Sequence, residues 1–137
     1  MAHVLGTQAW LDAVCDAING SEQYADVATD WDWPVAFAFE GAGDVPTRRV
    51  LLDLTAGVCR AARVVDEDGF AQAPFRISAP LDRWVEVLEG RVESMRALVL
   101  HRLHCEGDRL TLLRHVACAK ALLEAVRSVD VEVPVPA

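Results

Sequence analysis

The sequence has few positive charges: 13 Lys and Arg residues stand against 21 Asp and Glu residues, which gives a net charge of −8 over 137 residues. This charge is unfavourable beside phosphate backbones and anionic lipid surfaces, so no nucleic-acid partner is expected. No apolar run reaches the roughly 18 residues of a membrane span, so we predict no transmembrane segment. The N-terminus lacks the basic and apolar regions of a signal peptide, which predicts a cytoplasmic protein.

Motifs that mark catalysis are also missing. No serine stands in a Gly-x-Ser-x-Gly elbow, and Gly41-Ala42-Gly43 lies between two expected strands instead of before a helix, the wrong place for a phosphate loop. The four cysteines form no CxxC pair, which favours free thiols in apolar positions. His101, His104 and Cys105 are close in sequence, but strand alternation separates His104 from the other two. Neither a metal site nor a cofactor is predicted.

Apolar residues are plentiful at 53%, and the length fits one domain that can bury a real core. Thr7 and Ser21 are plausible N-caps, so we expect two N-terminal helices within residues 7–28. Alternating apolar residues predict strands over 35–40, 49–54, 58–65 and around 75–79, with a solvated turn at 66–69. These strands are expected to form an antiparallel meander.

The pattern of the C-terminal half predicts helix, strand and helix. Pro80 and Gly90 bracket an apolar stripe typical of a helix, a second short helix is expected over 92–97, and residues 98–106 alternate as a strand. From Asp108 as N-cap, apolar residues at helical spacing up to Val126 predict one long helix with a broad apolar face. The tail after 128 contains two prolines, so it is expected to be a flexible arm or an edge strand.

An excess of apolar surface without polar chemistry favours binding over catalysis. Helices with more apolar residues than one contact needs can leave a hydrophobic pocket against a sheet. The alternative is that the same residues fill the core or a dimer interface. The pattern alone leaves both interpretations open.

Four stretches, in order, resemble the sterol carrier protein family in its bacterial stand-alone form. They are FAFEG (37–41), VLLDLTAG (50–57), ISAPLDRW (77–84) and GRVESMRAL (90–98), the last running on to Glu106-Gly107-Asp108. The resemblance implies a single α+β domain over 1–137, with a curved, mostly antiparallel sheet of about five strands covered by helices. It also implies an apolar tunnel for a lipid, fatty acyl or sterol-like molecule. The sheet and its helices are expected within residues 34–127.

The resemblance suggests which residues line such a tunnel. The family often has a glycine where His101 stands, so a bulky imidazole there is expected to shorten or polarise the pocket. Met95 suits varied ligands because its thioether is flexible. Our predicted lining residues are Phe37, Phe39, Trp84, Leu88, Met95, His101, Leu113, Val116 and Leu123.

Two functions other than a carrier stay open at this point. In the first, the protein is an accessory subunit that meets a partner enzyme or a second copy through an apolar face. In the second, it is an enzyme that acts on a hydrophobic substrate through His101, the candidate most suited to titrate near neutrality.

Overall fold

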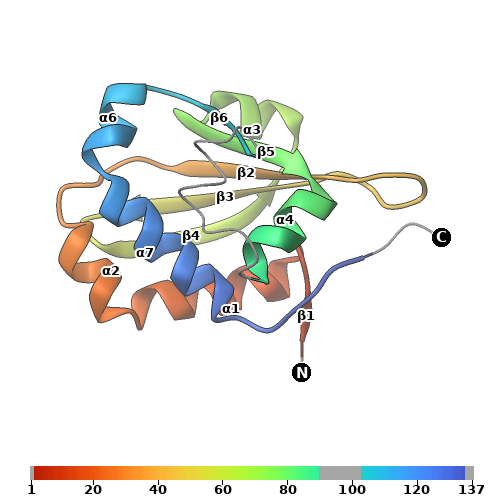
Figure 1. The fold of residues 1–137 in the computed structure, drawn as a ribbon, viewed down its shortest axis with the longest axis horizontal. Coiled ribbons are helices and arrows are strands. Elements are labelled where there is room, and N and C mark those ends of the chain that lie inside the picture. The colour runs from red at the N-terminus through yellow and green to blue at the C-terminus, as the bar shows by residue number, and fades with distance from the viewer. Residues whose placement is uncertain (1, 90–102, 135–137) are drawn as a thin grey trace.

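A five-stranded sheet with the order β4-β3-β2-β5-β6 forms the centre of the fold (Figure 1). The structure is a computed structural model that describes residues 2–89 and 103–134. The strands are β2 (Val35–Glu40), β3 (Arg48–Thr55), β4 (Val58–Val65), β5 (Phe75–Pro80) and β6 (His104–Glu106). Three of the four pairings are antiparallel, but β2 and β5 run parallel. The mostly antiparallel α+β sheet is confirmed, whereas the simple meander is wrong.

The parallel pairing depends on α3 (Glu67–Gln72), which stands where we predicted a solvated turn. Parallel neighbours need a crossover connection, and α3 provides part of it. Asp66 caps this helix, because its side chain accepts a hydrogen bond from the Gly69 N–H at 2.7 Å. Glu67 and Asp68 in the first turn also favour the positive end of the helix dipole. The acidic run therefore starts a helix.

The two N-terminal helices are confirmed as α1 (Gln8–Asn19) and α2 (Glu22–Val27). Thr7 and Ser21 are their N-caps, with side-chain oxygens that accept from the N–H groups of Trp10 and Tyr24. Each cap satisfies a backbone donor that has no partner within its helix.

The tight turn between β3 and β4 places α2 against the sheet. Ala56 and Gly57 both have positive φ, at 49° and 82°. A Cβ atom on Gly57 would lie 3.0 Å from the Cα and the carbonyl oxygen of Ala25 in α2. Glycine is therefore needed here both for the backbone conformation and for the close approach of the helix.

The predicted long C-terminal helix is interrupted. Asp108 is an N-cap as expected, but the chain forms α6 (Arg109–Arg114) and then α7 (Val116–Arg127), with non-helical backbone at His115. The helix after Pro80 is confirmed as α4 (Leu81–Leu88). The predicted helix over 92–97, the cap at Gly90 and the strand over 98–102 lie outside the described residues.

For the tail after 128 we expected either an edge strand or a flexible arm, and within its described residues a short edge strand is present. Residues Val131–Glu132 form β7, which pairs in parallel with β1 (His3–Val4) in a small separate sheet (Figure 1). Backbone hydrogen bonds from His3 to Asp130 and from Leu5 to Glu132 join the two segments. This pairing holds residues from both ends of the described chain together.

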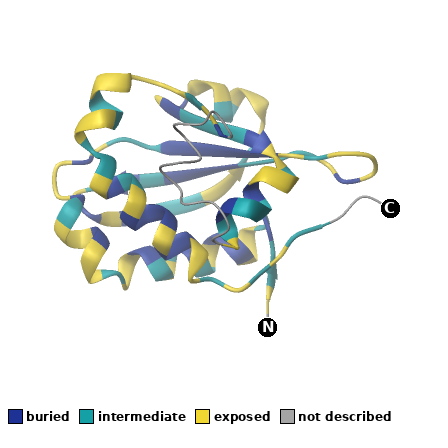
Figure 2. Ribbon diagram, viewed as in Figure 1, coloured by how far each residue is buried: buried dark blue, intermediate teal, exposed yellow. Residues whose placement is uncertain are grey.

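The sheet has two differently covered faces (Figure 2). We call the face that bears Val35, Phe37 and Phe39 the inner face, which packs against α1, α2, α4 and α7 in the main core. The opposite, outer face bears Ala36 and packs against α3 in a small second cluster. The main core thus lies on the inner face.

Candidate functional site

A cavity lies between the inner face of the sheet and three helices, α1, α4 and α7. Its enclosed volume is about 10 Å³, roughly what one water molecule needs. Together with adjoining open solvent, the empty space is about 330 Å³. The walls are Trp10, Leu11, Val14, Phe37, Phe39, Val50, Leu52, Trp84, Leu88, Leu123 and Val126.

Each wall of the cavity follows from the period of its element. In a strand, every second side chain points to the same face, which brings Phe37 and Phe39 of β2 together. In a helix, positions three or four apart share a face, which brings Leu123 and Val126 of α7 together. The cavity is therefore the meeting point of several regular apolar stripes.

Aromatic rings form one side of the cavity. Phe39 lies between two indoles, with ring centroids 5.6 Å from Trp10 and 5.0 Å from Trp84, and both contacts are edge-on. Phe37 meets Trp84 in the same way at 5.9 Å. Edge-to-face pairs of this kind add stability beyond the buried area. This wall is consequently well fixed.

Polar atoms are scarce at the cavity. The Trp84 indole N–H donates to the Ala38 carbonyl at 3.0 Å, so it is satisfied within the protein. Trp10 is only 3% exposed, and its N–H has no hydrogen-bond partner among residues 2–89 and 103–134. No charged side chain belongs to the walls as they are formed by the described residues.

The predicted lining residues divide into three groups: those in the cavity wall, those placed elsewhere, and those outside the described residues. Phe37, Phe39, Trp84, Leu88 and Leu123 do line the cavity. Their contact with a ligand stays a prediction.

Two predicted lining residues are placed elsewhere. Val116 is half-buried and does not line the cavity. Leu113 is 70% exposed, so its assignment to the pocket is wrong. The physical reason is the break at His115, which separates α6 from the helix that covers the sheet. Met95 and His101 lie outside the described residues.

The wall formed by α1 is absent from the predicted lining. Trp10, Leu11 and Val14 recur at helical spacing, but such spacing indicates only a buried face and not its neighbour. Val50 and Leu52 of β3 have the same alternation as the phenylalanines of β2 and signalled the inner face directly.

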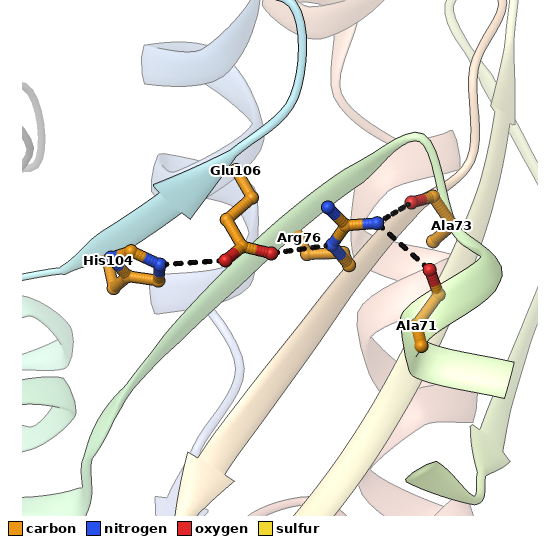
Figure 3. Close-up of polar contacts among 5 residues, drawn as sticks. All are labelled: Ala71, Ala73, Arg76, His104 and Glu106. Atoms are coloured by element: carbon orange, nitrogen blue, oxygen red, sulfur yellow. Dashed lines mark hydrogen bonds and ion pairs between the residues drawn. The ribbon is translucent and has the colours of Figure 1, made fainter. Parts of the chain in front are cut away.

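A polar cluster lies on the outer face, away from the cavity (Figure 3). Glu106 of β6 accepts from the Arg76 Nε of β5 at 2.9 Å, and its other oxygen lies 3.0 Å from His104 Nε2. Arg76 also donates to the carbonyls of Ala71 and Ala73 at the end of α3. Hydrogen bonds from His104 and Arg76 lower the pKa of Glu106. The cluster joins β6, β5 and α3.

Three of the four thiols are not activated as nucleophiles. Burial raises the pKa of Cys59 to about 12 and that of Cys118 to about 11, and it raises the pKa of Cys105 as well. These three groups are therefore protonated thiols at neutral pH, and the thiolate is the reactive form. Among the residues that the structure describes, no three His, Cys, Asp or Glu side chains are grouped to hold a metal ion. None of the helices in 2–89 and 103–134 is long and apolar enough to cross a membrane.

Comparison with known proteins shows which solved structures share this fold. No protein-family model and no curated protein sequence matches the chain. Among solved structures, a crystal structure of sterol carrier protein 2 is 37% identical, with a TM-score of 0.83, over 91% of this chain and 98% of that one. A conserved hypothetical protein from Thermus thermophilus, described as possibly a sterol carrier protein, is 34% identical, with a TM-score of 0.83, over 96% of this chain and 94% of its own.

A solved structure of lower sequence identity has the same fold. Sterol carrier protein 2 from Yarrowia lipolytica in its apo form has a TM-score of 0.59 at 15% identity, over 93% of this chain and 95% of that one. The fold is an α+β domain of the sterol-carrier type. It is defined by the order of the strands in the sheet, by the helices that cover the sheet and by the two structures at 37% and 34% identity. The chain belongs to the sterol carrier protein 2 family, and the resemblance seen in the sequence is confirmed.

Proposed function

We propose that this protein binds and carries a hydrophobic small molecule of the lipid, fatty acyl or sterol-like class in the cavity beneath α1, α4 and α7. The observation that carries the proposal is the uniformly apolar wall, to which the sheet and all three helices contribute. Burying an acyl chain against such a wall gives about 0.8 kcal/mol per methylene without any directed polar contact. Membership of the sterol carrier family supports the same function.

Binding must enlarge the cavity, because its enclosed volume holds only about one water-sized molecule. The aromatic wall is held by ring contacts and by the hydrogen bond from Trp84 to Ala38. Leu88, at the end of α4, is only half-buried, and its side chain has no polar group that could hold it in place with a hydrogen bond. We therefore expect the cavity to widen at the Leu88 side while the aromatic wall stays in place.

The test is a titration with saturated fatty acids and their methyl esters of increasing chain length. Binding is monitored through the intrinsic fluorescence of the cavity tryptophans. We expect affinity to rise roughly fourfold per added methylene until the cavity is full. Bound ligand should also raise the melting temperature, because it binds only the native state. Affinity that does not depend on chain length would contradict burial in a cavity.

Matched variants localise the binding. Leu123→Phe adds volume inside the cavity wall, whereas Leu113→Phe makes the same change at a side chain that is 70% exposed. We expect Leu123→Phe to weaken or abolish binding and Leu113→Phe to leave it unchanged, with circular dichroism confirming that both variants are folded. Equal effects of the two changes would place the ligand elsewhere. A protein that binds no apolar probe but forms a dimer would favour the accessory-subunit alternative.

A further inference from the structure

Two of the four cysteines meet where α1 packs against β4. Cys15 of α1 is half-buried, Cys59 of β4 is buried, and both are free thiols. The Cys15 thiol donates a hydrogen bond to the Cys59 carbonyl oxygen, with Sγ and O 3.4 Å apart. The two thiols interact with each other as well. Cys15 and Cys59 are therefore neighbours in space, although 44 positions separate them in the sequence.

Side chains of α1 on either side of Cys15 hold this junction in place. Asn19 contacts the Cys59 backbone twice: its Nδ2 donates to the carbonyl at 3.0 Å, and its Oδ1 accepts from the N–H at 2.8 Å. Further along β4, the Gln8 Nε2 donates to the Ala62 carbonyl at 2.8 Å. Because β4 is an edge strand, these contacts satisfy backbone groups that no neighbouring strand can reach. The helix and the strand thus keep the two thiols together, which gives them a high effective concentration for reaction with each other.

The hydrogen bond from Cys15 is not needed to satisfy the backbone. The Cys59 carbonyl already accepts from Asn19, and a thiol is a weak donor. Beyond packing, the second thiol adds a reaction that a single cysteine does not have. A sulfenic acid formed on one cysteine condenses with an adjacent thiol to give a disulfide.

We infer that Cys15 and Cys59 form an oxidation site at which a hydroperoxide converts the two thiols into a disulfide between α1 and β4. In the first step, the Cys15 sulfur attacks one peroxide oxygen and the O–O bond breaks. Cys15 becomes a sulfenic acid, and the other oxygen leaves with the thiol proton as water or an alcohol. In the second step, the Cys59 sulfur attacks the Cys15 sulfur, and the hydroxyl group leaves with the Cys59 proton as water. The thiols lose two electrons in total, and the peroxide gains them.

The exposure of the two thiols sets the order of these steps. Cys59 is only 2% exposed, so the oxidant meets the half-buried Cys15 first. Burial, followed by the hydrogen bond with the Cys15 thiol, raises the pKa of Cys59 to about 12. The attacking form is the thiolate, whose fraction rises with pH below the pKa. We therefore expect the disulfide to form faster at pH 9 than at pH 7.

The test treats the folded wild type with hydrogen peroxide and maps disulfides by mass spectrometry of tryptic peptides. Cleavage after Arg48 and Arg49 places the two cysteines in separate peptides. We expect one predominant crosslink, between Cys15 and Cys59, which dithiothreitol removes. Because the disulfide joins positions 44 residues apart, the melting temperature should rise by on the order of 10 °C. Failure to form this crosslink, whether Cys15 stays reduced or is oxidised to a sulfinic acid, would overturn the inference. The outcome does not depend on any ligand in the cavity, so it leaves the proposed function untouched.

Cys105 provides the matched control. It is half-buried like Cys15, but it lies on β6, at the opposite edge of the sheet from β4. Cys105→Ser should leave the crosslink between Cys15 and Cys59 unchanged. In Cys59→Ala, the sulfenic acid on Cys15 should persist and react with dimedone, with circular dichroism confirming the fold. Crosslinks from Cys15 to Cys105 or Cys118 that are as frequent as the one to Cys59 would mean that the thiols pair only after unfolding, and they would also overturn the inference.

Discussion

The two faces of the central sheet are built from the same strands but carry different side chains. On the inner face, β2 presents Phe37 and Phe39 to helices that contribute two tryptophans. On the outer face, the same strand presents Ala36, which joins Leu51 and the short helix α3 in a small cluster. No residue of α3 is fully buried, whereas α7 buries six. The bulk of the apolar packing is therefore on one side.

This difference shows how a small domain can hold both a cavity and a stable scaffold. Large rigid rings meeting at edge-on angles leave a space that smaller side chains would close. The small residue Ala36 on the outer face lets α3 lie close to the sheet. On the same face, the ion pair between Arg76 and Glu106 joins β5 to β6. The cavity lies on the inner face, whereas polar contacts on the outer face join β5, β6 and α3.

The largest expected effect comes from Phe39→Ala. This side chain is 3% exposed and lies between two indole rings, so its removal opens a large hole in the main core. We expect the free energy of unfolding, measured with urea, to fall by about 3 to 5 kcal/mol. Leu51→Ala, on the outer face, should cost about 2 kcal/mol, at the low end for such a change, because the small cluster can collapse around it. Equal losses would refute the asymmetry of the two faces.

A smaller effect is expected from Asp66→Ala, which removes the N-cap of α3. The lost hydrogen bond to the Gly69 N–H should lower the free energy of unfolding by about 1 kcal/mol. Glu67→Gln is the control, since it removes a charge from the first turn without removing the cap, and a few tenths of a kcal/mol are expected from it. An unchanged midpoint in Asp66→Ala would mean that α3 contributes nothing to the stability of the outer face.

The strands and helix caps were predictable because they depend on near neighbours in the sequence. The bounds of β2 and β4 match the expected ranges, and Thr7 and Asp108 cap helices as expected. The parallel pairing of β2 with β5 was not predictable, since it joins segments far apart in the chain and no local pattern records the partner. The acidic residues after β4 suit a turn and a helix N-terminus equally well, which is why α3 was missed.

The cavity was partly predictable for the same reason. The family resemblance suggested Phe37, Phe39, Trp84 and Leu88, all of which line the cavity. Alternation in β2 and helical spacing in α4 are local patterns that the sequence carries. The break at His115 could not be seen, because Leu110 and Leu113 continue the spacing of the next helix while being 67% and 70% exposed. Apolar spacing shows which residues can be buried together, and tertiary packing decides which of them are.

Acid should weaken the outer face through Glu106. Its folded-state pKa is lowered from 4.5 by hydrogen bonds to His104 and Arg76, so the contribution of this group is present above pH 4.5 and is lost as the pH falls through the lowered value. We expect Glu106→Gln to be less stable than the wild type at pH 7 and to approach it as the pH falls below 4.5, in urea unfolding at each pH. Glu124→Gln, an exposed change of the same charge on α7, is the control. A gap between Glu106→Gln and the wild type that does not narrow in acid would contradict the role of the ion pair.

The smallest effect is expected from Leu113→Ser, although this leucine shares the helical spacing of the cavity residue Leu123. Leu113 is 70% exposed on α6, so its replacement removes little buried apolar surface, and the free energy of unfolding should change by no more than about 0.5 kcal/mol. Leu123→Ala, at a side chain that is 4% exposed in the cavity wall, should cost about 2 to 5 kcal/mol. A loss above about 1 kcal/mol in Leu113→Ser would mean that α6 packs onto the body of the protein and that the C-terminal helix is continuous in its burial. A negligible loss would place the boundary of the main core at His115, between two leucines that the sequence pattern treats alike.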